Sequence, residues 1–251
     1  MGWRSGLRSL GGVLMADRTI RCDVDVDLMQ HMGSDSAIVA AAKVSTKGAA
    51  SVEEFDSEAG AGLINFLMKN RHGTPFEHNA MTFFISAPIF VFREFHRHRI
   101  GWSYNEESGR YKQLDPVFYV PGSDRNLVQV GKPGHYEYVP GTAAQSLDQA
   151  QRMAAAYHAA YDAYEAALEA GIAREVARAT LPVAIYSSMY ATCNARSLMA
   201  FLSLRTKHPE STFPSFPQRE IEMVAEKMES LFAGLFPLTH EAFCKHGRVS
   251  P

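Results

Sequence analysis

The sequence predicts an α+β fold, because candidate strands are concentrated in its first half and helical periodicity dominates its second half. Short alternating or β-branched runs occur before residue 121, whereas long apolar seams with helical spacing occur after residue 145. Strands followed by helices are typical of α+β proteins. With 46% hydrophobic and 21% charged residues among 251, the composition is that of a globular protein rather than of a disordered or collagen-like one.

The first half is predicted to contain short strands and two helices. Residues 20–26 alternate apolar and polar side chains, residues 81–86 are rich in aromatic and β-branched types, and residues 117–120 form another short strand. A helix is expected over residues 58–70. A second helix is expected over residues 89–98, where a preceding proline suits the first helical turn.

The second half is predicted to be mainly helical after an irregular start. Residues 121–141 carry three prolines and four glycines and are expected to form a loop. A long helix follows over residues 146–170, with a tyrosine-alanine seam that packs either inside the chain or against another subunit. Further helices are expected over residues 172–180, 194–207 and 217–232.

Charge and cysteine content argue against several classes of protein. The 25 Lys and Arg against 27 Asp and Glu leave a net charge of −2, which disfavours a protein that coats nucleic acid or an anionic membrane. The three cysteines are far apart and cannot all pair, which favours a reducing, cytoplasmic setting. No apolar run approaches the ~20 residues of a membrane span. Residues 1–18 are expected to form a flexible extension, and residues 19–251 a single domain.

Residues 93–112 are the segment richest in chemical groups, with five Lys and Arg against three Glu and several aromatic residues. Ser108, Gly109 and Arg110 offer a hydroxyl, a closely approachable backbone and a guanidinium, which together suit a phosphate monoester. Glu106 adds a group that can recognise an amide-bearing ring. The alternatives are an exposed basic helix end or a non-enzymatic module that binds nucleotides or single-stranded nucleic acid.

Other kinds of site have weaker support. Histidines in residues 72–78 and 96–98 suggest a metal-dependent hydrolase, but Arg97 and Arg99 would repel a dication placed between them, so no metal is expected. None of the cysteines lies in a context typical of a nucleophile. The sequence also lacks the glycine-rich motifs of P-loop and Rossmann proteins.

Two further arginines have two interpretations each. Arg205 lies near the end of the helix predicted over residues 194–207 and emerges near its apolar face. It is either a snorkelling or ion-paired arginine, or a buried cation that meets a ligand. Arg178 follows Glu175 by three residues, and is either half of a surface helix pair or an anchor for an anion.

Several of these residues together resemble the signature of the flavin-dependent thymidylate synthases. The signature is Arg-His-Arg, then seven or eight residues, then Ser. Here it reads Arg97-His98-Arg99, eight residues, then Ser108. The longer pattern around this serine is matched by Ser103, Asn105, Glu106 and Arg110. Residues 72–78 (HGTPFEH) and 194–198 (NARSL), the latter followed by Leu204-Arg205, also resemble segments of this family, and the resemblance runs from about residue 20 to 246.

The resemblance implies an enzyme that methylates dUMP reductively to dTMP. Methylenetetrahydrofolate would supply the carbon, and FAD reduced by NADPH would supply the hydride. It further implies a central twisted sheet with flanking helices, residues 19–251 as the catalytic domain, and a homotetramer with active sites where subunits meet. Small molecules are then the expected partners, with neither nucleic acid nor a membrane.

The resemblance also assigns site residues position by position. Those expected to contact FAD are Thr74, Arg97, His98, Arg99, Glu106, Asn194, Ala195, Arg196 and Ala200. Those expected to bind dUMP are Glu94, Phe95, His96, Arg97, Glu106, Glu107, Ser108, Gly109, Arg110, Arg178 and Arg205. Within this set, residues 108–110 would hold the phosphate. Arg205 would be the catalytic residue, because it would lie against the uracil and favour its ionisation.

Two of these positions differ from common family members. Ala200 stands where many members have a polar side chain near the flavin, and Glu94 stands where glutamine is common. The spacer between Arg99 and Ser108 is the longer of the two lengths that the family uses.

Overall fold

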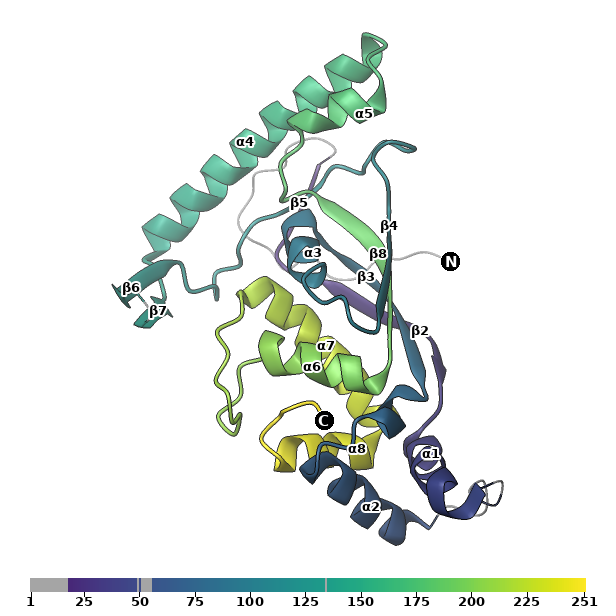
Figure 1. Ribbon diagram of the computed structural model, residues 1–251. Coiled ribbons are helices and arrows are strands. Elements are labelled where there is room, and N and C mark those ends of the chain that lie inside the picture. Colours follow the sequence, from purple (N-terminus) through teal and green to yellow (C-terminus); the bar gives the residue numbers. More distant parts are fainter. Residues whose placement is uncertain (1–17, 49, 51–55, 134) are drawn as a thin grey trace.

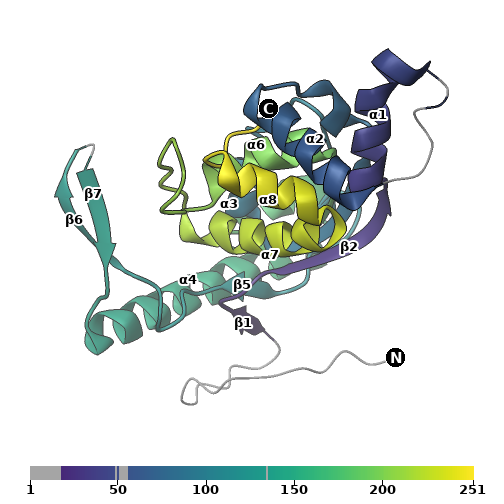
Figure 2. The ribbon, with the colours of Figure 1, turned by 90° about the horizontal axis from the view of Figure 1, so that it is seen from below.

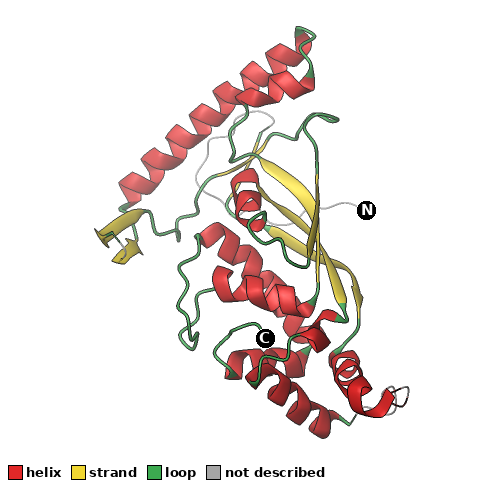
Figure 3. Ribbon diagram, in the orientation of Figure 1, coloured by secondary structure: helices red, strands yellow, loops and turns green. Residues whose placement is uncertain are grey.

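A four-stranded antiparallel sheet forms the centre of the computed structural model, which describes residues 18–48, 50, 56–133 and 135–251. Its strands lie in the order β2 (Asp25–Met32), β3 (Ala80–Pro88), β8 (Tyr186–Cys193) and β4 (Trp102–Glu106). Helices flank this sheet (Figure 3), so the predicted mixed architecture is confirmed. Cys193, at the end of β8, is buried.

Most of the helices pack against one another and against the sheet. They are α1 (Asp35–Lys47), α2 (Ser57–Lys69), α3 (Ile89–Phe95), α6 (Ala195–Arg205), α7 (Arg219–Leu235) and α8 (Pro237–Lys245). Helix α7 contacts β2, α3, α6 and α8, and α2 contacts α8. Seen from below, these helices form a layered group next to β2 (Figure 2). Their apolar faces and the inward residues of β3 and β8 make up the larger hydrophobic core.

The long helix α4 (Ala143–Glu169) runs past the other end of the sheet (Figure 1). It begins with a capping box, in which Thr142 and Gln145 satisfy each other's backbone N–H groups. Tyr157, Tyr161 and Tyr164 are buried, and Tyr157 stacks on Phe118 with ring centroids 5.3 Å apart. These three tyrosines of the predicted seam therefore pack inside the chain.

The prediction of one strand over residues 20–26 and the prediction of a loop over residues 121–141 are both wrong in part. Residues 20–26 divide between β1 (Thr19–Arg21), which pairs in parallel with β5 (Val117–Tyr119), and β2 in the central sheet. Within 121–141 the chain forms a hairpin of β6 (Val128–Lys132) and β7 (His135–Val139). Its prolines lie outside both strands, so they do not interrupt the ladder.

Other expected helices are shorter than predicted or were not recognised. Residues 172–180 contain only α5 (Arg174–Ala177) and the 3₁₀ turn η3 (Arg178–Thr180), and α3 ends at Phe95 rather than residue 98. After α3 the N–H of His98 bonds to the carbonyl of Phe95, a tighter turn that ends the helix. The sequence interpretation also missed α1, β4, β8 and α8.

The start of the described chain is attached to α4. The predicted extension falls mostly on residues 1–17, which lie outside the described residues. Arg18 donates hydrogen bonds to the carbonyl of His158 at 2.8 Å and to the carboxylate of Glu165 at 3.2 Å. Across the described part of the chain, no helix combines the length and apolar character needed to cross a membrane.

Candidate active site

Two asparagines fix the first turn of α6. The Oδ1 atom of Asn194 accepts a hydrogen bond from the N–H of Ser197 at 2.9 Å and caps the helix. The Oδ1 atom of Asn79, which is 4% exposed, accepts the N–H of Ala195 at 2.7 Å. Because Asn79 lies just beyond the 3₁₀ turn η2 (Thr74–Glu77), the predicted FAD contacts at Thr74, Asn194 and Ala195 come from adjoining elements.

Arg196, in the same helical turn, is held by two acceptors. Its Nε donates to the carbonyl oxygen of Pro251 at 2.7 Å, and its Nη1 lies 2.5 Å from Oε1 of Glu77. A Cβ atom on Gly73 would lie 2.5 Å from the guanidinium and 2.8 Å from the Pro251 oxygen, so this approach requires glycine. A guanidinium has five N–H donors. Most of those of Arg196 thus have no partner among the described residues and are available to a ligand beside the exposed Thr74.

Arg205, at the other end of α6, is also oriented by two partners. Its Nη1 lies 2.6 Å from Oε2 of Glu94, and its Nε donates to Nε2 of His98 at 3.0 Å. Burial, followed by the positive charges of Arg205 and Arg97, lowers the pKa of His98 from 6.5 to about 4. His98 is therefore neutral at physiological pH, which lets its Nε2 atom accept the hydrogen bond from Arg205.

Other residues that the sequence predicts for the site differ in how exposed their side chains are. Arg97 and Arg99 are exposed and form no ion pair with any residue in the described part of the chain. His96 and Ala200 are exposed as well, whereas the ring of Phe95 is fully buried in the core. The side chain of Phe95 therefore serves packing, and its neighbours offer the polar groups.

The eight-residue spacer begins with a turn that packs on α6. Gly101 has a φ of +70°, in the left-handed region, and a Cβ there would lie 2.1 Å from Oγ of Ser197. That hydroxyl donates to the carbonyl of Ile100 at 3.0 Å. The turn thus joins the end of the Arg-His-Arg segment to α6 before β4 begins at Trp102.

A cavity of about 410 Å³ lies where β4 ends. It is lined by Ile89, Glu106, Glu107, Gly109, Leu114, Glu175, Arg178, Ala179, Leu181, Pro182, Val183, Ile185 and Ser187. The structure therefore brings residues of the signature together with Arg178, which follows them by about seventy positions in the chain. A small set of polar groups on a largely apolar lining is typical of a site for a small molecule.

The three residues expected to hold phosphate form a compact turn beside this cavity. The N–H of Arg110 donates to Oγ of Ser108 at 3.2 Å. Gly109 is buried, and a Cβ built on it would lie 3.4 Å from the Cδ atom of Arg178. The Nε of Arg110 donates to a carboxylate oxygen of Glu175 at 2.8 Å. Arg110 therefore already has an anionic partner within its own chain.

The cavity wall is rich in carboxylates. Glu106, Glu107 and Glu175 line it, and Arg178 is the single arginine among its lining residues, all of which belong to the described chain. Burial raises the pKa of Glu106. One chain by itself thus presents little positive charge to a phosphate.

The predicted substrate residues fall into two groups within one chain. Glu106, Glu107, Gly109 and Arg178 line the cavity and Ser108 and Arg110 adjoin Gly109, whereas Glu94, Arg97 and Arg205 are not among its lining residues. Glu94 and Arg205 instead contact each other at the end of α6.

Several residues that shape these groups were not identified from the sequence. They are Gly73, Glu77 and Asn79 around α6, and Glu175 and Ser187 at the cavity. From the sequence, Gly73 has no assigned role, and Glu77 is considered only with the histidines as a possible metal ligand. The side-chain alternation of β8, in which Met189, Ala191 and Cys193 face the core, would have located Ser187 on a strand.

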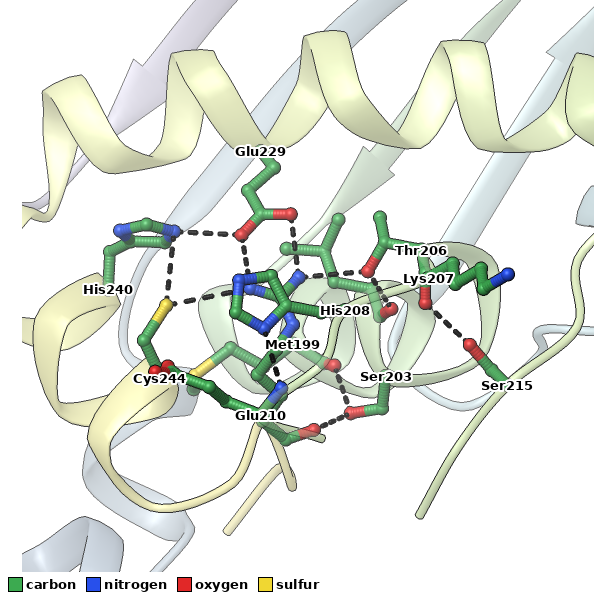
Figure 4. Close-up of polar contacts among 12 residues, drawn as sticks. Met199, Ser203, Thr206, Lys207, His208, Glu210, Ser215, Glu229, His240 and Cys244 are labelled. Atoms are coloured by element: carbon green, nitrogen blue, oxygen red, sulfur yellow. Dashed lines mark hydrogen bonds and ion pairs between the residues drawn. The ribbon is translucent and has the colours of Figure 1, made fainter. Parts of the chain in front are cut away.

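One cluster has the spacing of a metal site but the contacts of an ion-pair network. Glu229, His240 and Cys244 lie close enough to share an ion, as Figure 4 shows. However, the guanidinium of Arg248 donates to both carboxylate oxygens of Glu229 at 2.7 Å, which places a fixed cation there. The histidines that suggested metal ligands in the sequence belong to no such group among the described residues.

Comparisons with known proteins give consistent matches over most of the chain. The family described as Thymidylate synthase complementing protein matches residues 27–238. The flavin-dependent thymidylate synthase of Streptomyces avermitilis is 62% identical over 235 residues, covering 93% of this chain and 96% of its own. That of Tropheryma whipplei is 55% identical, covering 94% and 98% of the two chains.

A solved structure shares the fold. The UMP/dUMP methylase PolB from Streptomyces cacaoi, bound with 5-Br dUMP, superposes with a TM-score of 0.88 at 52% identity. The match covers 93% of this chain and all of that one. The same methylase bound with 5-Br UMP gives a TM-score of 0.86.

Proposed function

The chain belongs to the flavin-dependent thymidylate synthase family, and on that premise we propose that it methylates dUMP reductively to dTMP. Methylenetetrahydrofolate is the carbon donor, and NADPH is the reductant. The observation that carries the proposal is the cavity at the end of β4, because its wall includes Glu106, Glu107 and Gly109 of the signature region together with the separately predicted Arg178.

The donor set near α6 fits FAD. Arg196 keeps free N–H groups, and Arg97 and Arg99 are exposed without ion-pair partners among the described residues. Guanidinium groups of this kind recognise the anionic diphosphate of a dinucleotide. When bound, FAD supplies the hydride that the reaction requires. The protein then needs no covalent nucleophile, in agreement with the buried position of Cys193.

The substrate pocket proposed here orients the nucleotide by its phosphate and its base. Ser108, Gly109 and Arg110 bind the phosphate through a hydroxyl, a backbone N–H and a guanidinium. For Arg110 to do so, its guanidinium must share or exchange its contact with Glu175. Glu106 and Glu107 lie where they can accept hydrogen bonds from the base or sugar.

Arg205 is proposed to stabilise negative charge that develops on the uracil. Its side chain is 17% exposed and its guanidinium is held by Glu94 and His98, so it needs little reorganisation to act. A fixed cation in a water-poor site stabilises such charge far more than a solvated one. Neutral His98 does not neutralise this cation, whereas Glu94 offsets part of its charge.

We further propose that a complete site needs a second copy of the chain, as in the homotetramer implied by the family. Two observations support this. The cavity has three carboxylates but one arginine, and Arg97 and Arg205, which should also reach dUMP, are not among its lining residues. Arginines from a neighbouring subunit would supply the missing positive charge.

The proposed reaction is tested with purified protein, FAD, NADPH and methylenetetrahydrofolate. With dUMP we expect dTMP to form and NADPH to be oxidised, and the protein to have a flavin absorption spectrum that changes when dUMP is added. Because the methylase PolB is described as acting on UMP and dUMP, UMP is assayed in parallel. A folded, FAD-loaded sample that forms no methylated nucleotide from either substrate would refute the proposal.

The shared site is tested by subunit complementation. Arg110→Ala and Arg205→Ala should each be nearly inactive alone. If these residues act on one substrate from different subunits, mixed oligomers contain some sites with both arginines intact and regain activity. Mixtures that stay inactive, despite proven subunit exchange, would show that each site is built from one chain.

The setting in the cell remains a prediction. Cys22, Cys193 and Cys244 are all free thiols, which supports the reducing, cytoplasmic compartment expected from the sequence.

A further inference from the structure

Residues 248–251, called the strap below, connect a buried ion-pair network to the candidate flavin-binding arginine. Arg248, 3% exposed, has a positive φ of 55°, and its guanidinium bonds to Glu229, to the Oγ1 atom of Thr206 at 2.8 Å and to the Sγ atom of Cys244 at 3.5 Å. The hydroxyl of Ser203 donates to the Arg248 carbonyl at 2.7 Å. Figure 4 shows the partners of this network, drawn from α6, α7 and α8.

The network is charged and both terminal nitrogens of Arg248 are hydrogen-bonded, so it can anchor a short segment. Burial opposes ionisation of Glu229, but hydrogen bonds from His240 and Arg248 lower its pKa to about 2. Hydrogen bonds to Cys244 and Glu229 raise the pKa of His240 to about 9. At neutral pH, one carboxylate therefore pairs with two cations, and breaking one partner of such a buried set is strongly unfavourable.

Beyond this anchor, the strap runs half-buried to the first turn of α6, where Pro251 is buried. The Nη1 atom of Arg71 donates to the carbonyls of Val249 at 2.6 Å and Ser250 at 3.0 Å. The hydroxyl of Ser250 donates to the carbonyl of Arg196 at 2.8 Å, and the Pro251 carbonyl accepts from the Arg196 side chain. The strap therefore contacts both the backbone and the guanidinium of Arg196.

Gly73 shows that this contact is sterically constrained. Its φ is ordinary, so its backbone does not require glycine. A Cβ there would nevertheless overlap both the Arg196 side chain and the Pro251 carbonyl. The close packing of η2, the strap and Arg196 thus depends on a residue without a side chain.

We propose that the strap is a positioning segment for FAD, which fixes the Arg196 guanidinium with its free N–H groups directed at the cofactor. The inference rests on the proposed function, because it takes Arg196 as a ligand of FAD. An arginine that is ordered before binding loses less rotamer freedom when the ligand arrives. Without the strap, Glu77 alone holds this guanidinium, and FAD affinity falls about tenfold.

Two variants disturb the packing between the strap and Arg196 while keeping arginine at position 196. Deleting residues 249–251 removes the carbonyl acceptor but leaves the Arg248 network. Gly73→Ala leaves the strap in the chain but places a Cβ against both the Arg196 guanidinium and the Pro251 oxygen, so it breaks their contact from the other side. Gly62→Ala is the matched control, because a Cβ at Gly62 on α2 meets no atom within 4 Å. Arg196→Ala defines the effect of losing the ligand completely.

The FAD dissociation constant is measured by titration, together with the dUMP dissociation constant of FAD-saturated protein and the thermal midpoint of the FAD-free protein. We expect the deletion and Gly73→Ala to weaken FAD binding about tenfold, with dUMP affinity and the midpoint nearly unchanged. Gly62→Ala should bind FAD and dUMP as the wild type does, with a midpoint that is equal or higher because alanine favours the helix. Gly73→Ala keeps the inference testable if the deletion lowers the midpoint.

Each other outcome has a definite meaning. If both strap variants bind FAD as the wild type does, the inference is wrong. It is also wrong if Arg196→Ala binds FAD normally, or if dUMP affinity falls as much as FAD affinity does. A wild-type protein that binds no FAD would instead contradict the proposed function itself.

Discussion

The depressed pKa of His98 predicts a measurable acid sensitivity of the folded protein. In the folded chain this pKa is about 4, against 6.5 for an ordinary histidine, because the ring is buried and faces Arg205 and Arg97. Below pH 6.5 the unfolded chain binds a proton at this residue while the folded chain does not. Stability is therefore lost as the pH falls from about 6.5 towards 4. Between pH 7.5 and 5 the expected loss from this one residue is about 2 kcal/mol.

Other groups partly conceal this effect in the whole protein. His240 has a raised pKa of about 9, so its stabilising contribution is full in acid and is lost as the pH rises through 9. Glu229 has a lowered pKa of about 2, and its contribution is lost only below about pH 4.5. The pH profile of the wild type alone is therefore not diagnostic, and a comparison with a variant is needed.

His98→Gln isolates the contribution, because a glutamine oxygen can still accept the hydrogen bond from Arg205 but cannot titrate. The free energy of unfolding is measured by urea denaturation at pH 7.5 and pH 5, with FAD-free protein at one fixed concentration. We expect the variant to lose about 2 kcal/mol less than the wild type between these pH values. His96→Gln, at an exposed site, is the control. Equal losses in wild type and His98→Gln would refute the reasoning.

Three other substitutions have defined outcomes. Arg205→Ala should lower kcat/KM for dUMP by about 100-fold, because it removes a preorganised cation; a dTMP-formation assay that shows less than a threefold change would contradict this role. Glu220→Ala should lower the free energy of unfolding, measured in urea, by about 2 kcal/mol. The reason is that the buried Glu220 carboxylate accepts a hydrogen bond from the Nε of Arg125 at 2.8 Å. An unchanged urea midpoint would show that this ion pair does not stabilise the fold. Gly101→Ala should lower the thermal midpoint, since a Cβ would overlap Oγ of Ser197. Adding Ser197→Ala should recover part of that loss. If the double variant recovers nothing, the overlap with Ser197 is not the cause of the loss.

The helices with long apolar seams could be predicted from the sequence because their signal is local. The spacing of apolar residues located α4, α6 and α7 to within a few positions. Strand β8 was missed because Ser187, Ser188 and Thr192 make its sequence look polar, and its place is decided by pairing with β3 and β4. Such pairing depends on contacts between distant segments, which no short window contains.

The same distinction applies to the candidate site. The signature over residues 97–110 is contiguous, so its chemistry could be inferred from the order of its residues alone. The partners that orient it could not: Arg196 meets Glu77 across 119 positions and Pro251 across 55. An arginine reveals its charge in a sequence, but the acceptors that fix its direction are a property of the fold.

Helix α6 connects these observations, because it carries one candidate ligand at each end. Arg196 and Arg205 are nine residues apart, which corresponds to about 14 Å along a helix. A helix of this length is stiff, so the spacing between the flavin-side and substrate-side arginines is set by α6 and not by the loops. The two arginines nevertheless have separate supports, since the strap and Glu77 hold Arg196 whereas Glu94 and His98 hold Arg205. Loss of the strap should therefore weaken FAD binding and leave the substrate-side cation in place, a separation that a general loosening of α6 would not produce.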